Sequence, residues 1–142
     1  KLANIRCADV MSRQLITVTH STPLSEAWPL FGKHHIKALP VIDNMGRIAG
    51  IVTPADFVRH DAMQPAAQAS GRISQIMTRK VRVARIDRHL VDLIPLFGGS
   101  GHHHLPVVEA DGRLAGIITQ TDVVAALGRA GAGGSMPAAH EA

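Results

Sequence analysis

The sequence predicts a mixed α/β fold (α+β) in which one β-α-β-β-α unit is used twice. When the 142-residue chain is shifted by 66 positions, residues 8–59 align with residues 74–125 without a gap, and 18 of the 52 aligned pairs are identical. Self-similarity at a fixed period indicates a repeated supersecondary unit. A hydrophobic content of 46% at this length suffices for a buried core. We therefore expect one module made of two small halves.

The first part of each unit combines a short lead-in, a strand and a helix. In the first copy, a helical turn at Asp9–Ser12 leads to a strand near Leu15–Val18. Thr22 then offers a capping hydroxyl before Pro23, which suits the first position of a helix. We expect this helix to run to about His34.

A β-hairpin and a second helix complete each unit. Ile36–Asp43 is apolar and β-branched enough for a strand, and Asn44-Met45-Gly46 supplies the turn. The returning strand is Arg47–Val52, after which Thr53-Pro54 begins a helix that reaches about His60. The second copy repeats this order 66 residues later.

Proline interrupts the first helix of both copies. Pro29 and Pro95 each remove a hydrogen bond and crowd the preceding turn, and Gly32 and Gly98 follow three residues later. We expect a kinked or short first helix in each half.

The repeat divides the chain into four parts. Residues 1–60 form the first unit with its N-terminal lead-in, and residues 73–127 form the second. Residues 61–72, rich in Ala, Gln, Ser and Pro, are expected to be a linker. Residues 128–142, rich in Gly and Ala, are expected to be a disordered tail.

Composition limits the classes of partner. The net charge is +4, but the basic residues are scattered and only four aromatic residues occur, so we expect no nucleic-acid partner. The single cysteine, Cys7, excludes an internal disulfide and a multi-cysteine metal site. No apolar run approaches the ~20 residues of a membrane span. The chain opens at Lys1, so we expect a piece of a longer protein.

The strongest local signal is a Gly-x-x-Thr-x-x-Asp sequence, present at residues 50–56 and 116–122. Its glycine lets a ligand or another backbone approach a strand closely. Its Thr begins a helix, where a phosphate is favoured, and its Asp can accept hydrogen bonds from ribose hydroxyls. The same spacing also fits a capping box, in which the acid binds the Thr amide. The local pattern leaves both interpretations open.

Over residues 8–127 the chain resembles a tandem of cystathionine-β-synthase-type (CBS) domains, also called a Bateman module. The shared marks are the 66-residue repeat, the Leu-Pro-Val strands at 39–41 and 105–107, the hairpin entries Asp43 and Glu109, and both Thr-x-x-Asp endings. Residues 5–12, 36–41 and 101–108 further resemble the soluble C-terminal module of HPP-type integral membrane proteins.

The resemblance implies a regulatory, non-enzymatic module with no required cofactor. Its two repeats would pack about a pseudo-twofold axis and bind an adenine nucleotide (ATP, ADP or AMP) in clefts between them. One cleft would contain Thr119, Asp122, Leu15, Ile16, Thr17, Ile36, Lys37 and Ala38. The other would contain Thr53, Asp56, Val81, Arg82, Val83, His102, His103 and His104. Asp would hold the ribose, Thr a phosphate and the apolar wall the base, while Lys37 or His103 could meet further phosphate charge.

The resemblance also implies a homodimer and an attached transmembrane domain, which would place this part on the cytoplasmic side of the membrane in a bacterial membrane protein. Two other functions stay open. The chain could be a structural dimerisation or docking module without a ligand. It could also sense a divalent metal through His102 and His104, although no metal-ligand spacing supports such a site. No nucleophile elbow, Walker-type loop or HExxH motif is present.

Overall fold

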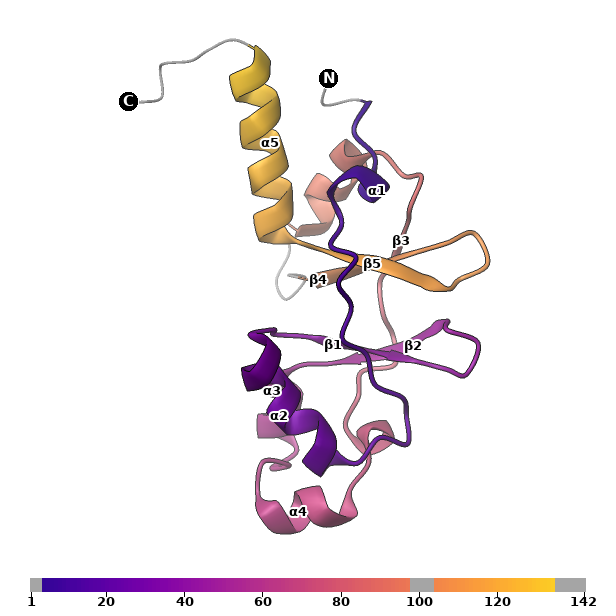
Figure 1. Cartoon of the computed structure of the whole chain (residues 1–142), viewed down its shortest axis with the longest axis vertical. Coiled ribbons are helices and arrows are strands. Elements are labelled where there is room, and N and C mark those ends of the chain that lie inside the picture. The colour runs from indigo at the N-terminus through magenta and orange to yellow at the C-terminus, as the bar shows by residue number, and fades with distance from the viewer. Residues whose placement is uncertain (1–3, 98–103, 135–142) are drawn as a thin grey trace.

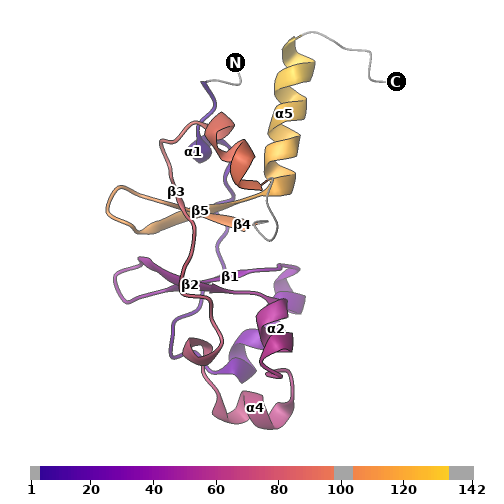
Figure 2. The same cartoon turned by 180° about the vertical axis from the view of Figure 1, so that it is seen from behind.

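The computed structural model describes residues 4–97 and 104–134. It consists of two similar halves stacked along the long axis, with the two sheets facing each other and the helices on their outer sides (Figures 1 and 2). The first half contains α2 (Leu24–His34), β1 (Leu39–Ile42), β2 (Ile48–Val52) and α3 (Pro54–Arg59). The second contains β3 (Ala84–Arg85), the 3-10 helix η3 (Leu90–Phe97), β4 (His104–Val108), β5 (Leu114–Thr119) and α5 (Gln120–Gly134). Three short helices lie in the connecting segments: α1 (Cys7–Val10), α4 (Pro65–Ser70) and η2 (Ile73–Gln75).

The two hairpins have the same register, as the repeat predicts. In β1 and β2, which are antiparallel, Val41 faces Gly50. In β4 and β5, also antiparallel, Val107 faces Gly116. Each hairpin has a register shift directly after that valine, and β3 adds a parallel strand to β4. These equivalent pairs, 66 residues apart, confirm the predicted α+β repeat.

The first residues of each repeat pair with the hairpin of the other repeat. Ser12 exchanges two backbone hydrogen bonds, of 2.9 and 3.0 Å, with Ile117 of β5. Thr78 exchanges two, of 3.0 and 2.9 Å, with Ile51 of β2. Figure 1 shows the first of these segments running from α1, beside the second half, down to the first half. The backbone therefore ties the two halves together at two equivalent places.

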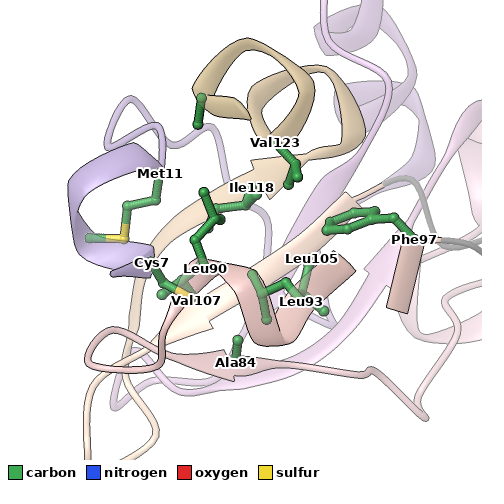
Figure 3. Close-up of a cluster of buried hydrophobic side chains, with 11 residues drawn as sticks. Cys7, Met11, Ala84, Leu90, Leu93, Phe97, Leu105, Val107, Ile118 and Val123 are labelled. Atoms are coloured by element: carbon green, nitrogen blue, oxygen red, sulfur yellow. The ribbon is translucent and has the colours of Figure 1, made fainter. Parts of the chain in front are cut away.

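The hydrophobic cores follow the same exchange. The core of the second half includes Cys7 and Met11 from the N-terminal segment, packed beside Leu90 and Ile118 (Figure 3). The core of the first half includes Ile73 and Ile76 from the first residues of the second repeat. The lead-in of the unit predicted at residues 1–60 therefore helps to complete the core of the other half.

Gly50 and Gly116 are required by these crossings rather than by a ligand. A Cβ atom on Gly116 would lie 2.6 Å from the Met11 sulfur and 2.8 Å from the Ser12 carbonyl oxygen. A Cβ atom on Gly50 would lie 2.9 Å from the Thr78 carbonyl oxygen. The sequence left open whether a ligand or another backbone segment approaches these glycines. The structure shows another backbone segment at both positions.

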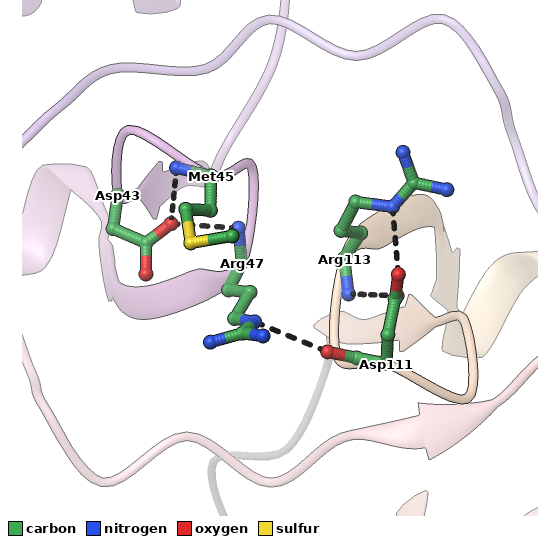
Figure 4. A network of polar contacts seen from close by, with 5 residues as sticks. All are labelled: Asp43, Met45, Arg47, Asp111 and Arg113. Carbon is green, nitrogen blue, oxygen red and sulfur yellow. Dashed lines mark hydrogen bonds and ion pairs between the residues drawn. The ribbon is translucent and has the colours of Figure 1, made fainter.

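The two hairpin turns touch each other (Figure 4). The Leu114 amide donates to the Gly46 carbonyl at 2.9 Å, and the Arg47 Nε donates to the Asp111 carbonyl at 3.2 Å. Each turn is stabilised by a carboxylate that accepts backbone N–H groups. The amides of Arg47 and Met45 hold the pKa of Asp43 below its usual value, and the Arg113 amide does the same for Asp111.

Several predicted element boundaries differ from the structure. The helical turn predicted at Asp9–Ser12 lies at Cys7–Val10, and the strand predicted at Ile36–Asp43 covers Leu39–Ile42. Of the strand predicted at Leu15–Val18, only Val18 forms a bridge, to Val41, because residues nearer to Ser12 run across to the other half. The helix predicted to start at Pro23 begins at Leu24, with Pro23 as its N-cap. The Thr22 hydroxyl instead accepts a hydrogen bond from the Thr19 amide at 3.0 Å, so it stabilises the preceding turn.

The proline interruption has different outcomes in the two halves. In the first half, α2 keeps 11 residues with Pro29 inside it, so of the two predicted outcomes, a kinked or a short helix, the short helix does not occur there. Pro29 and Ser25, whose carbonyl would otherwise pair with residue 29, are both exposed, so water can solvate that carbonyl. In the second half, the segment around Pro95 forms a 3-10 helix of 8 residues.

The predicted linker and tail both contain helix. α4 lies inside residues 61–72 and packs against α2, and its Pro65 occupies a position where a missing N–H costs nothing. α5 continues past residue 128 to Gly134, because Val123 and Ala126 anchor it on the core and alanine favours helix. Residues 135–142 lie outside the described part of the chain. Within the described ranges, no helix combines the length and the apolar character needed to cross a membrane.

Replacement of Gly116 by Ala should destabilise the protein, because the new methyl group overlaps a backbone oxygen as well as Met11. We expect a loss of about 1–3 kcal/mol in the free energy of unfolding, measured by urea denaturation. The matched control is Gly32→Ala in α2, where nothing lies within 4 Å of the added Cβ. That change should stabilise the protein by about 0.5–1 kcal/mol. Equal effects of the two substitutions would contradict the close packing of Gly116 against the Met11–Ser12 segment.

Cys7 should be unreactive in the folded protein. Its side chain is buried, and desolvation raises the pKa of the thiol from 9.0 to about 11. At pH 8 the thiol is therefore protonated as well as inaccessible. Labelling with a thiol reagent should be slow in buffer and rapid in urea; rapid labelling of the folded chain would show that Cys7 is accessible.

Candidate functional site

Two clefts of about 670 and 630 Å³ lie where the repeats meet. We name them the α3 cleft and the α5 cleft, after the helix that carries the Asp of each Thr-x-x-Asp sequence. The α3 cleft is lined by Lys37, Ile51, Thr53, Pro54, Ala55, Asp56, Arg59, Thr78, Lys80, Val81, Arg82 and His104. The α5 cleft is lined by Ser12, Gln14, His35, Ile36, Lys37, Ala38, His104, Ile117, Thr119, Gln120, Thr121 and Asp122.

The structure brings most of the predicted site residues together. Thr53 and Asp56 lie in the α3 cleft with Val81, Arg82 and His104. Thr119 and Asp122 lie in the α5 cleft with Ile36, Lys37 and Ala38. Lys37 and His104 line both clefts, so the two spaces share part of their wall.

Some predicted residues lie elsewhere. Leu15, Ile16 and Thr17 are absent from the lining of both clefts, and Ile16 packs against the core of the first half. The reason is the pairing of Ser12 with Ile117, which makes Ser12 and Gln14 the wall residues instead.

Val83 lies in a separate surface hollow beside Arg85 and Asp87. It is the equivalent of Thr17, and neither residue reaches a cleft. His102 and His103 fall outside the described residues.

The sequence analysis missed several polar lining residues, including Arg59 and Lys80 of the α3 cleft and Gln14 of the α5 cleft. Lys80 and Gln14 occupy equivalent positions of the two repeats. The 66-residue period therefore offered a signal that these two residues have the same place in the two clefts. Arg59 stands three residues after Asp56, a spacing at which opposite charges meet on a helix.

The Thr-x-x-Asp sequence of the first repeat forms the capping interaction that the sequence left open. The Thr53 amide donates to Asp56 Oδ2 at 2.8 Å, and the Thr53 hydroxyl donates to the same oxygen at 3.3 Å. Asp56 is the buried charged residue of the described chain, and its Oδ1 accepts a hydrogen bond from Arg59 Nη1 at 2.6 Å. Both carboxylate oxygens are therefore engaged.

The second repeat forms the same cap with one difference. The Thr119 amide donates to Asp122 Oδ2 at 2.9 Å, and the Asp122 amide donates to the Thr119 hydroxyl at 3.2 Å. The position equivalent to Arg59 is Ala125, which has no charge. Within the described residues, the side-chain hydrogen bonds of Asp122 use only Oδ2 and leave Oδ1 available at the cleft.

These arrangements suit a small polar ligand better than a metal. Volumes of about 300–1,000 Å³ are usual for ligand sites, and each cleft combines apolar side chains with a carboxylate and cations. Within residues 4–97 and 104–134, no group of three or more His, Cys, Asp or Glu residues could hold a metal ion. The metal alternative would need His102, which lies outside those ranges.

Comparison with known families agrees with this architecture. A model of the CBS domain matches residues 7–62 and 73–129, which together make up most of the chain. The chain belongs to the CBS domain family. Each match contains one hairpin and one Thr-x-x-Asp ending, and the resemblance to CBS tandems is confirmed.

Solved CBS pairs share the fold. CBSX2, a CBS-pair protein of Arabidopsis thaliana, has a structure in complex with AMP. That structure is 28% identical, with a TM-score of 0.77 over 89% of this chain and 98% of the other. The CBS pair of protein MJ0100, in complex with 5′-methylthioadenosine and S-adenosyl-L-methionine, is 29% identical, with a TM-score of 0.73 over 88% and 97% of the two chains.

Curated relatives include proteins with enzyme names, but the likeness covers little of them. L-aspartate semialdehyde sulfurtransferase of Methanocaldococcus jannaschii is 32% identical over 118 residues, or 81% of this chain and 22% of that protein. Inosine-5′-monophosphate dehydrogenase of the same organism is 28% identical over 82% of this chain and 22% of its own length. The chain therefore spans about a fifth of the length of these two relatives.

The two aspartates should differ in their effect on stability. Asp56→Ala removes the cap and leaves Arg59 without its partner, whereas Asp122→Ala removes a cap alone. We expect about 0.5–2 kcal/mol for the loss of each cap, with the larger loss at Asp56 because it is buried. Urea denaturation measures both.

Asparagine is the matched substitution at each site, because its amide oxygen can still accept from the Thr amide. Asp56→Asn and Asp122→Asn should therefore destabilise less than the alanine variants. Alanine variants as stable as the asparagine variants would show that the caps contribute nothing.

Proposed function

We propose that this chain is a regulatory module that binds an adenine nucleotide (ATP, ADP or AMP) in the clefts between its CBS repeats. The observation that carries the proposal is the α3 cleft, where the Asp56 carboxylate and several cationic side chains surround a space of about 670 Å³. AMP in CBSX2 and S-adenosyl-L-methionine in the MJ0100 pair support an adenosine compound as the ligand class.

Each part of an adenine nucleotide has a complementary group in the α3 cleft. The Asp56 carboxylate accepts hydrogen bonds from ribose hydroxyls once Arg59 has left its Oδ1. Lys80 and Arg82 attract the phosphates, and the apolar atoms of Ile51 and Val81 cover the base. The residues come from β2, α3 and the crossing segment at 78–82, so one ligand contacts several segments at once.

Regulation follows from the position of the clefts between the repeats. A ligand that contacts both repeats favours the relative arrangement that gives it most contacts. We propose that an attached membrane domain receives this change, with this module on the cytoplasmic side of the membrane. The sequence resemblance to HPP-type proteins supports this part of the proposal.

We further propose that two copies associate through their helices. Val58 of α3 and Val124 of α5 occupy equivalent positions and are 59% and 61% exposed, which places an apolar side chain on the outer surface of both helices. Burial of such side chains on both copies is favourable in water.

A docking module without a ligand is the second candidate, and a specific observation favours it. Both aspartates cap helices, which accounts for the Thr-x-x-Asp sequences without any ligand. Under this alternative the clefts bind no adenosine compound, and substitution at Asp56 or Asp122 changes stability alone.

A thermal-shift panel at pH 7 with ATP, ADP, AMP, S-adenosylmethionine and zinc tests the proposal. A ligand at 100 times its dissociation constant adds about 2.7 kcal/mol to the free energy of unfolding. That gain should raise the midpoint by several degrees. We expect a shift with an adenine nucleotide, and its loss in the Asp56→Asn, Asp122→Asn double variant.

The double variant is a suitable control because asparagine retains the caps. Its circular dichroism should match that of the unchanged protein. A shift with zinc alone would support the histidine alternative. A panel without any shift would favour the docking module.

A further inference from the structure

The Arg59–Asp56 ion pair closes one of the two predicted ribose sites. Arg59 Nη1 lies 2.6 Å from Asp56 Oδ1, the oxygen that is not used in the helix cap. The Asp56 side chain is 5% exposed and that of Arg59 is 61% exposed. The arginine therefore reaches from the surface of α3 onto a buried carboxylate, and it can leave without disturbing the core.

The second repeat has no equivalent of this ion pair. Ala125 stands where the first repeat has Arg59, and the Asp122 cap uses Oδ2. A ribose can therefore approach Oδ1 of Asp122 without displacing an arginine of the same helix turn. The two clefts therefore differ at the aspartate carboxylate that we propose to bind the ribose.

The described lining of the α3 cleft also carries more positive charge than that of the α5 cleft. The described lining of the α3 cleft holds four cationic side chains, from Lys37, Arg59, Lys80 and Arg82, against the carboxylate of Asp56. The described lining of the α5 cleft holds Lys37 against the carboxylate of Asp122, with His35 and His104 beside them. Gln14 occupies the position that Lys80 has in the α3 cleft.

We propose that Arg59 makes the α3 cleft selective for adenosine compounds that carry a phosphate chain, while the α5 cleft accepts adenosine compounds with little regard to phosphate. This proposal rests on the proposed function, since it concerns the ligand class of the same clefts. A ribose that binds Asp56 must displace Arg59 from Oδ1. The displaced guanidinium then needs another anion, and a phosphate chain supplies one.

Binding of a ribose at Asp56 exchanges the hydrogen-bond partners of both Asp56 and Arg59. Adenosine without phosphate breaks the Arg59–Asp56 interaction and returns only hydroxyl hydrogen bonds to the carboxylate. A nucleotide breaks the same interaction, but its phosphate oxygens pair with Arg59, a geometry that guanidinium groups favour. Lys80 and Arg82, which line the same cleft, add to that preference.

Isothermal titration calorimetry with ATP and adenosine, without added divalent cations, tests the proposal. In the Asp122→Asn variant, which weakens ribose binding in the α5 cleft, ATP should bind the α3 cleft at least about tenfold more tightly than adenosine. Arg59→Ala in that background should bring the two affinities closer, with tighter binding of adenosine and weaker binding of ATP. Arg59→Gln, which can still donate to Asp56, is the second variant if alanine impairs folding.

A control and a reciprocal variant complete the experiment. Arg129→Ala removes the same charge from an exposed position of α5 outside both clefts, and it should leave the ratio of affinities unchanged. Ala125→Arg, combined with Asp56→Asn, places a guanidinium at the equivalent site of the second repeat. It should give the α5 cleft a preference for ATP that the Asp56→Asn variant lacks.

The outcomes separate this proposal from the proposed function. Equal affinities for ATP and adenosine in the Asp122→Asn variant, or a ratio that Arg59→Ala leaves unchanged, would overturn the role of Arg59 while nucleotide binding stands. Absence of binding of either compound to the unchanged protein would overturn both.

Discussion

The crossing of the two lead-in segments is the constraint on which the rest of the structure depends. Ser12 pairs with Ile117 and Thr78 pairs with Ile51, so each repeat has a backbone segment of the other on its hairpin. Cys7 and Ile73 are carried by these segments into the opposite cores. Neither half can therefore bury its hydrophobic residues alone, and the two repeats form one structural unit. The clefts lie beside the crossings because the crossing residues themselves form part of the walls.

The aspartates of the two Thr-x-x-Asp sequences serve the fold before they meet any ligand. One oxygen of each carboxylate accepts a hydrogen bond from the Thr amide three residues earlier and so caps the helix. This interaction stabilises the start of the helix without any contact to a distant segment. The second carboxylate oxygen has different neighbours in the two repeats. Arg59 donates a hydrogen bond to it in the first repeat, whereas Ala125, at the equivalent position of the second repeat, has no group that could donate one. A capping interaction and a ligand contact are therefore compatible at Asp122, whereas a ligand contact at Asp56 requires the displacement of Arg59.

The approximate symmetry of the repeats makes their differences informative. The hairpins, glycines and caps are equivalent because each is required by backbone geometry in both halves. The polar lining is not equivalent: Lys80 corresponds to Gln14, and Arg59 to Ala125. None of these four side chains belongs to the two hydrophobic cores of the described residues. The two clefts consequently share a shape while differing in charge.

The sequence by itself determined the repeat, the α+β class, both hairpins and the Thr-x-x-Asp caps. The repeat is visible as 18 identical pairs at one spacing, and turn chemistry and helix capping act over a few neighbouring residues. The place of the Thr-x-x-Asp endings in the clefts was implied by the resemblance to CBS tandems. Only the tertiary structure decided which half each lead-in joins and hence that Ser12 and Gln14, rather than Leu15–Thr17, form a wall. It also decided that α5 continues beyond residue 128 and that Arg59 binds Asp56. These outcomes depend on contacts between segments far apart in the chain or on the side-chain geometry of one folded helix, and a local pattern specifies neither.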